Sequence, residues 1–163
     1  MARRRPPTVH GLVLLDKPAG MTSHDAVFRL RKHFGEKRIG HAGTLDPDAT
    51  GLLVIGVGNA TRLIRFMGNM DKTYSCDIVF GSETDTLDDS GTVTRTHGMS
   101  PPTLERIKDV IAEQFTGNIL QVPPMVSALK VDGVRLHQLA REGIEVEREA
   151  RPITVYSFDV EPT

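Results

Sequence analysis

The sequence predicts a protein of the α+β class. Short apolar runs typical of strands and amphipathic segments typical of helices both occur along its 163 residues, without the regular alternation of βαβ units. Its 39% hydrophobic and 25% charged residues are those of an ordinary globular protein. No apolar run reaches the roughly 18 residues that a membrane helix needs. We therefore expect one domain, residues 1–163, with a sizeable core.

The front of the chain predicts a buried strand and then a capped helix. Residues 11–18 (GLVLLDKP) form a short apolar run closed by a turn signal, which is typical of a buried strand. Thr22 or Ser23 can cap the next segment, with Asp25 in its first turn, and Gly35 can end it. The expected apolar face of this helix consists of Ala26, Val27, Leu30 and Phe34.

The next segments predict two more strands with a short helix between them. Residues 51–58 (GLLVIGVG) have the composition of a second buried strand, and residues 60–67 predict a short helix. Apolar and polar side chains alternate in residues 73–81 (TYSCDIVFG), which predicts a strand with one apolar face. That face would contain Tyr74, Cys76, Ile78 and Phe80.

A further helix is predicted after the two consecutive prolines at positions 101 and 102. Proline is favoured in the first turn of a helix, and Ser100 or Thr103 can serve as its N-cap. Gly117 is placed to end it. The core stripe of this helix would be Leu104, Ile107, Ile111 and Phe115.

The remaining segments are less regular. Residues 82–91 (SETDTLDDSG) indicate an acidic, solvated turn, and residues 91–98 indicate an edge strand. Residues 121–150 combine an extended part, a short helix and a charge-rich return, which indicates a flexible excursion from the main body. Residues 153–160 (ITVYSFDV) predict a last strand.

Charge is distributed unevenly along the chain. Residues 1–70 contain 11 Lys and Arg against 5 Asp and Glu, a net charge of +6, whereas residues 71–163 contain 9 against 16, a net charge of −7. This fits either a solvated basic surface or a front half that faces phosphates, with residues 3–5 (RRR) as a mobile arm. The single cysteine, Cys76, excludes an internal disulfide and fits a reducing cytoplasm. Six scattered histidines lack the spacing of zinc ligands.

A loop at residues 40–51 (GHAGTLDPDATG) contains two acids, Asp46 and Asp48. Asp46 precedes Pro47, so its backbone should be extended rather than helical. The two carboxylates are either Asx-turn or capping groups, as Asp beside Pro or Gly commonly is, or one of them performs chemistry.

Other chemical motifs fit this sequence poorly. Residues 46–50 (DPDAT) match the D-x-D-x-T pattern of phosphohydrolases, but the first Asp of that pattern follows a hydrophobic strand, and here GHAGTL precedes it. The acids of residues 82–91 lack calcium-loop spacing. The glycines after residue 55 lack the spacing of a nucleotide-binding loop.

Four segments resemble, in order, the TruB family of tRNA pseudouridine synthases. They are residues 11–27 (GLVLLDKPAGMTSHDAV), 38–63 (RIGHAGTLDPDATGLLVIGVGNATRL), 71–81 (DKTYSCDIVFG) and 121–143 (QVPPMVSALKVDGVRLHQLAREG). The resemblance runs from about residue 10 to residue 163, and the loop motif is its most specific part. It implies an α+β fold with a mixed, largely antiparallel central sheet and flanking helices.

The activity that the resemblance implies is the isomerisation of a T-loop uridine to pseudouridine in tRNA. The enzyme would be a cytoplasmic monomer that needs no cofactor and no metal. Asp46 matches the essential aspartate, which attacks C1′ of a flipped-out uridine, removes the C2′ proton to give a glycal, or adds to the base. The sequence leaves these three routes open.

The resemblance also assigns residues that bind the RNA. Tyr74 matches a tyrosine that stacks on the flipped uracil and can remove the C5 proton, and His41 a histidine that stacks where the uridine was. From the residues alone, the favoured interpretation of Tyr74 is a core tyrosine on a strand, because Cys76, Ile78 and Phe80 share its face. The simpler interpretation of His41 is a loop histidine bonded to backbone. Lys17 would be structural support or a charge partner, and Lys130 would contact phosphate. Arg141 would assist Lys130 or be a solvated helix charge.

Several positions depart from the family pattern. Val126 and His137 stand where many relatives carry Tyr, which bears on RNA contacts within residues 121–150. Relatives also continue into a K-G-T-Y-I-R-like segment whose Arg pairs with the catalytic Asp. We therefore expect this chain to be the N-terminal portion of a catalytic domain, without its remainder or any C-terminal RNA-binding domain. The alternative is a non-catalytic RNA-binding or tRNA-folding module.

Overall fold

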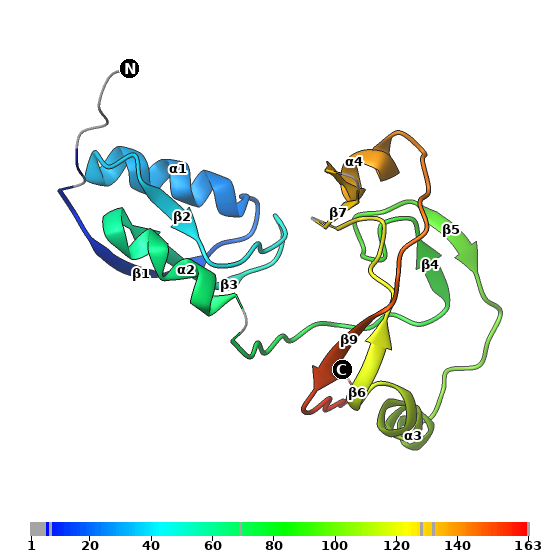
Figure 1. The fold of residues 1–163 in the computed structure, drawn as a ribbon. Coiled ribbons are helices and arrows are strands. Elements are labelled where there is room, and N and C mark those ends of the chain that lie inside the picture. The colour runs from blue at the N-terminus through cyan, green and yellow to red at the C-terminus, as the bar shows by residue number, and fades with distance from the viewer. Residues whose placement is uncertain (1–5, 7, 69, 128, 132, 163) are drawn as a thin grey trace. The chain divides into compact units, whose positions relative to one another are not determined.

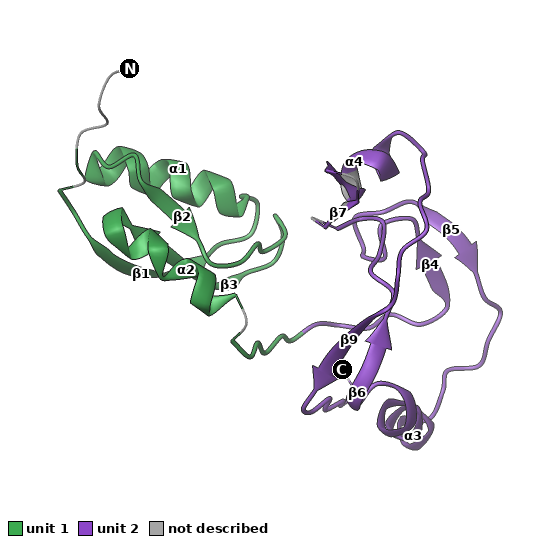
Figure 2. Cartoon of the chain, in the orientation of Figure 1, with its two compact units in different colours: residues 1–75 green, residues 76–163 purple. Residues whose placement is uncertain are grey.

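The computed structural model describes residues 6, 8–68, 70–127, 129–131 and 133–162. The chain forms two compact units, residues 1–75 and residues 76–163 (Figures 1 and 2). The expected N-terminal arm, residues 3–5, lies outside the described residues.

Unit 1 is built on a three-stranded antiparallel sheet in the order β1-β3-β2. Its elements are β1 (Gly11–Lys17), α1 (Ser23–Phe34), β2 (Ile39–His41), β3 (Gly51–Val57), the 3-10 helix η1 (Gly58–Arg62) and α2 (Ile64–Met67). The strands predicted at 11–18 and 51–58 form β1 and β3, which end one residue earlier than predicted and pair along their whole length, from Gly11 opposite Val57 to Lys17 opposite Gly51. The short helix predicted at 60–67 is divided between η1 and α2.

The core of unit 1 lies between α1 and the sheet. Ala26 and Val27 of α1 pack with Ile39, Leu53, Ile55 and Val57, all of them buried. Leu30 and Phe34, predicted for the same helical face, pack partly buried against this cluster. The 3.6-residue periodicity of α1 therefore identified the buried face correctly.

The N-terminus of α1 is closed by a reciprocal capping box. Thr22 Oγ1 accepts a hydrogen bond from the Asp25 backbone N–H at 3.1 Å, and the Asp25 carboxylate accepts one from the Thr22 backbone N–H at 3.0 Å. The Thr22 hydroxyl also donates to that carboxylate at 2.6 Å. These bonds from Thr22 hold the pKa of the Asp25 carboxyl below its usual range. Of the two candidate caps, Thr22 is the cap, and Gly35 ends the helix at a φ of 61°.

Thr22→Ala should lower the free energy of unfolding by about 1 kcal/mol, the usual loss when a Ser or Thr cap becomes Ala. Thr22→Ser, which keeps the hydroxyl, should stay close to the wild type. Part of the difference in stability between Thr22→Ala and the wild type should depend on pH, because the hydrogen bonds from Thr22 lower the pKa of the Asp25 carboxyl. A lowered carboxyl pKa stabilises the fold above the unfolded-state pKa, and this contribution is lost as the pH falls through the folded-state pKa. Urea unfolding between pH 7 and pH 3 measures both effects. A constant difference over that range would contradict the involvement of Asp25.

The described residues of unit 2 form three separate antiparallel strand pairs and two helices. Its elements are β4 (Ser82–Thr84), β5 (Val93–Thr96), α3 (Leu104–Gln114), β6 (Gly117–Gln121), β7 (Lys130–Val131), β8 (Val134–Arg135), α4 (Leu136–Arg141) and β9 (Arg151–Val155). The pairs are β4-β5, β6-β9 and β7-β8. Helices and antiparallel sheets together confirm the α+β class.

The helix predicted after the two prolines is α3, with Thr103 as its N-cap. Of its expected stripe, Ile111 is buried, Leu104 and Ile107 are partly buried, and Phe115 is exposed. Gly117 does not directly end the helix: Phe115 does so, and Gly117 opens β6 at a φ of 83°.

The prediction of a strand at residues 73–81 is wrong. Residues 71–80 are assigned to no helix or strand, and every one of them is exposed. No described strand pairs with this segment, so its alternating apolar side chains have no face to bury. The last strand is also displaced, since β9 covers Arg151–Val155 rather than residues 153–160. Residues 82–84, expected in a turn, form β4 instead.

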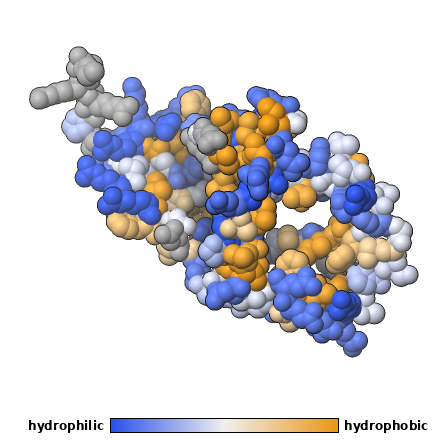
Figure 3. All heavy atoms as spheres, turned by 45° about the vertical axis from the view of Figure 1, so that its right-hand side comes forward, coloured by the Kyte–Doolittle hydropathy of each residue, from blue (hydrophilic) through white to orange (hydrophobic). Residues whose placement is uncertain are grey.

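Large apolar side chains are exposed in both units, as the orange spheres of Figure 3 show on one face. In unit 1 these include Leu12 and Leu14 of β1 and Leu52 of β3, which lie on the sheet face opposite the buried Leu53 and Ile55. Among the described residues, no helix is both long and apolar enough to cross a membrane.

Candidate functional site

The loop with the two acids connects β2 to β3 in unit 1. The Ala42 N–H donates to Val54 O at 2.8 Å and extends the pairing of the two strands beyond His41. The Ala49 N–H donates to Asp46 O at 3.2 Å, so residues 46–49 form a hydrogen-bonded β-turn. Pro47 occupies the second position of that turn, where its fixed φ is favourable. Asp46 is not part of a helix, as its position before Pro47 predicts.

Lys17 is hydrogen-bonded to this loop through the carbonyl of Pro47. Its side chain is 0% exposed, and its ammonium donates to Pro18 O at 2.9 Å, Met21 O at 2.8 Å and Pro47 O at 2.9 Å. An ammonium has three N–H donors, so each one has an acceptor. A buried charge is tolerated when it is fully hydrogen-bonded in this way. Lys17 thus joins the end of β1 to the residue that follows Asp46.

Two further contacts hold the residues on either side of Asp46. The Gly20 N–H donates to Pro47 O at 3.0 Å. On the other side, Ser23 Oγ donates to Leu45 O at 3.1 Å and accepts from the Leu45 N–H at 2.9 Å. The sequence indicated Ser23 only as a possible helix cap, and nothing local in it pointed to this contact 22 residues away.

The carboxylates of Asp46 and Asp48 are both exposed. In the described part of the chain, neither accepts a hydrogen bond, and neither forms an ion pair. The Asx-turn and capping roles, which require such bonds, are therefore not the role of either side chain here. The backbone of the loop is fixed, while the Asp46 carboxylate is open to a ligand.

His41, the last residue of β2, is partly exposed at the start of the loop. Its Nδ1 is bonded to Gly43 O. A carbonyl only accepts, so Nδ1 carries the proton and, in the neutral ring, Nε2 is an acceptor. This contact is the one expected of a loop histidine bonded to backbone, the interpretation that the residues alone suggest. The same bond fixes the plane of the ring.

The other predicted site residues lie outside the loop at 40–51. Tyr74 lies in the unpaired segment that leads to unit 2, and it is 71% exposed. Lys130 is in β7 of unit 2, with its backbone opposite Arg135, and its side chain lies outside the described residues. The same is true of the His137 side chain. Arg141 is exposed in the last turn of α4.

The acidic turn of unit 2 binds its own backbone and hydroxyls. Asp88 Oδ1 accepts from Ser90 Oγ at 2.6 Å, Thr86 Oγ1 at 2.7 Å and the Ser90 N–H at 3.0 Å. The hydrogen bonds from Ser90 and then Thr86 hold the pKa of the Asp88 carboxyl below its usual range. Asp85 Oδ1 accepts from the Thr92 N–H at 2.8 Å. The prediction of a turn is right for this stretch, whose acids stabilise the turn.

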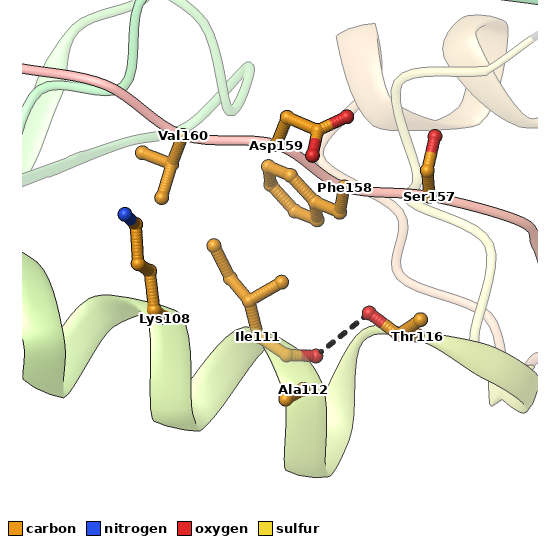
Figure 4. A pocket seen from close by; sticks show the side chains of 8 residues that line it. All are labelled: Lys108, Ile111, Ala112, Thr116, Ser157, Phe158, Asp159 and Val160. Atoms are coloured by element: carbon orange, nitrogen blue, oxygen red, sulfur yellow. Dashed lines mark hydrogen bonds between the residues drawn. The ribbon is translucent and has the colours of Figure 1, made fainter.

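Unit 2 also contains an open pocket of about 420 Å³ between α3 and the residues that follow β9 (Figure 4). Ile111, Phe158 and Val160 make its apolar part, and Lys108 and Asp159 stand at its edge. None of the predicted site residues lines it.

Comparison with known proteins shows the family of this chain. Residues 31–162 match the family model described as TruB family pseudouridylate synthase (N terminal domain). The chain belongs to the TruB family. The matched range includes the whole loop at 40–51, and it reaches nearly to the end of unit 2.

Individual relatives in the TruB family are similar over most of this chain. A tRNA pseudouridine synthase B of Streptococcus gordonii is 48% identical over 93% of this chain, and one of Bacillus cereus is 51% identical over 92%. These alignments cover 52% and 49% of the two relatives, so the chain spans about half the length of the curated relatives it matches. A solved chain from a crystal structure of a Cbf5-Nop10-Gar1 complex has a TM-score of 0.55 at 26% identity, over 93% of this chain and 36% of that one.

Lys17→Met should destabilise unit 1 by about 3 kcal/mol, because it removes three hydrogen bonds from a charged donor to partly buried carbonyls. Pro47 O keeps the Gly20 N–H as a donor, whereas no described contact replaces the donor to Pro18 O or Met21 O. Lys37→Met removes an exposed lysine of the same unit and should change the free energy of unfolding by less than about 0.5 kcal/mol. Urea unfolding followed by circular dichroism compares the two. Equal stability of both variants would show that the three contacts of Lys17 contribute little.

Proposed function

We propose that this chain supplies the catalytic aspartate of an enzyme that isomerises a T-loop uridine of tRNA to pseudouridine. The observation that carries the proposal is Asp46, an exposed carboxylate with no partner among the described residues, on a loop fixed on both sides. Membership of the TruB family supports the reaction class, and the names of relatives support tRNA as the substrate.

The proposed reaction is an isomerisation: substrate and product have the same atoms, so no second substrate is consumed. The bond between N1 of uracil and C1′ of the ribose breaks, the base turns, and C5 forms a new bond to C1′. The proton on C5 is removed and N1 gains one. Asp46 serves this exchange by attacking C1′, by removing the C2′ proton or by adding to the base, and each route uses an ionised carboxylate held close to the reacting atom.

The remaining site residues take roles around the flipped uridine. Tyr74 stacks on the uracil and removes the C5 proton, and His41 stacks in the place that the uridine left. Lys130 contacts phosphate, within residues 121–150 as an RNA-binding excursion. Lys17 supports the loop, for which its three hydrogen bonds to carbonyls are the supporting observation. Tyr74 is exposed, which leaves its ring open to stacking.

The protein is proposed to work as a monomer in the cytoplasm, where tRNA is modified. The alternative function is that of an RNA-binding or tRNA-folding module without catalysis. It is favoured by one observation: within the described residues, no Lys or Arg side chain pairs with Asp46. The two functions make opposite predictions for substitution of this carboxylate.

Asp46→Asn should reduce pseudouridine formation in a T-stem-loop RNA at least about 1,000-fold, because the amide neither attacks nor accepts a proton as the carboxylate does. Binding of the same RNA should remain within about threefold of the wild type. The measurement uses the protein expressed from its complete coding sequence, with tritium release from 5-tritiated uridine as the assay.

Asp48→Asn is the matched control, since it removes an exposed carboxylate two residues away in the same turn. It should leave the rate within about threefold of the wild type. A protein that forms pseudouridine equally well with Asn at position 46 would refute the catalytic role of Asp46. A wild-type protein that binds the RNA without turnover would favour the non-catalytic module.

A further inference from the structure

Ser23 occupies an unusual position for a hydroxyl at the start of a helix. It is the first residue of α1 and is only 2% exposed, yet the capping of α1 is done by its neighbour, Thr22. Its side chain points instead to the loop and bonds both backbone groups of Leu45, at 3.1 Å to the carbonyl and 2.9 Å from the N–H. The two adjacent hydroxyl residues therefore have separate tasks.

We infer that Ser23 is a positioning residue for the Asp46 carboxylate. The inference rests on the catalytic role proposed for Asp46. Leu45 directly precedes Asp46, and with both its N–H and its carbonyl bonded to one oxygen, its peptide planes are fixed relative to α1. The Leu45 side chain packs against the core cluster of unit 1, which adds a third restraint.

The restraint on the other side of Asp46 is independent of Ser23. Pro47 O accepts from Lys17 Nζ at 2.9 Å and from the Gly20 N–H at 3.0 Å. Asp46 therefore lies between Leu45, which is hydrogen-bonded to α1, and Pro47, which is hydrogen-bonded to the end of β1. Removing Ser23 releases one end of this span and leaves the other end in place.

The expected consequence is a loss of rate with little loss of binding. A reactive group displaced by about 1 Å can lose about 100-fold in rate, whereas RNA binding depends on many phosphate contacts elsewhere. Ser23→Ala should therefore lower kcat about 10- to 100-fold and leave KM within about threefold. Ser23→Cys, which is similar in size and keeps a weak donor and acceptor, should recover part of kcat.

Thr22→Ala is the matched control, because it weakens the same helix end without touching the loop. Pseudouridine formation in a T-stem-loop RNA is measured at a temperature where all variants are folded, using the protein from its complete coding sequence. The inference predicts that Thr22→Ala keeps the wild-type kcat while Ser23→Ala does not.

Three results would overturn the inference. One is a Ser23→Ala protein with wild-type kcat, and another is an equal fall in kcat for Thr22→Ala, which would show a general effect of helix stability. A third is a change confined to KM, which would place Ser23 in RNA binding. Failure of the proposed function looks different, since the wild-type protein itself would then form no pseudouridine, and the positioning role would fall with it.

Discussion

The buried ammonium of Lys17 is the interaction on which the rest of the site depends. A charge at a place that is 0% exposed is costly unless every donor is matched, and the three acceptors of Lys17 come from residues 18, 21 and 47. These are all backbone carbonyls rather than carboxylates. The contact therefore specifies a path of the chain, and it holds the turn after β1 against the loop between β2 and β3.

That arrangement separates a fixed backbone from an open side chain. The residues on both sides of Asp46 are hydrogen-bonded to Ser23, Lys17 and Gly20, whereas the described residues offer its carboxylate no partner. This arrangement favours a carboxylate that acts on one atom of a ribose. The conformational entropy of the backbone around Asp46 is lost when the protein folds, before the substrate binds. The same backbone bonds also restrain Asp46 without lowering the reactivity of its side chain.

Much of unit 1 was predictable from local patterns. The capped helix at 23–34 follows from cap chemistry and a periodicity of 3.6, and the two apolar strands follow from short apolar runs. These signals act within a few residues. The strand predicted at 73–81 failed, since alternation shows which side of a segment is apolar but not whether a partner strand is present.

The site itself was predictable only in part. The glycine- and proline-bounded loop and its aspartates are visible in the sequence, and the resemblance to a family distinguishes Asp46 from Asp48. The contacts that hold the loop are not visible, because Lys17 and Pro47 are 30 residues apart and Ser23 and Leu45 are 22 apart. No local pattern distinguishes a serine that caps a helix from one, beside the cap, whose side chain bonds a loop distant in the sequence.

The most direct test of the tether at Lys17 is amide hydrogen exchange measured residue by residue in Lys17→Met. The Gly20 and Ala49 amides, which close the loop through Pro47 O and Asp46 O, should exchange at least about 10-fold faster relative to the Ala42 amide, whose bond to Val54 O belongs to the sheet. If Gly20 and Ala49 keep their protection relative to Ala42 when the ammonium is gone, the loop is held by other means, and the buried lysine does not position the aspartate.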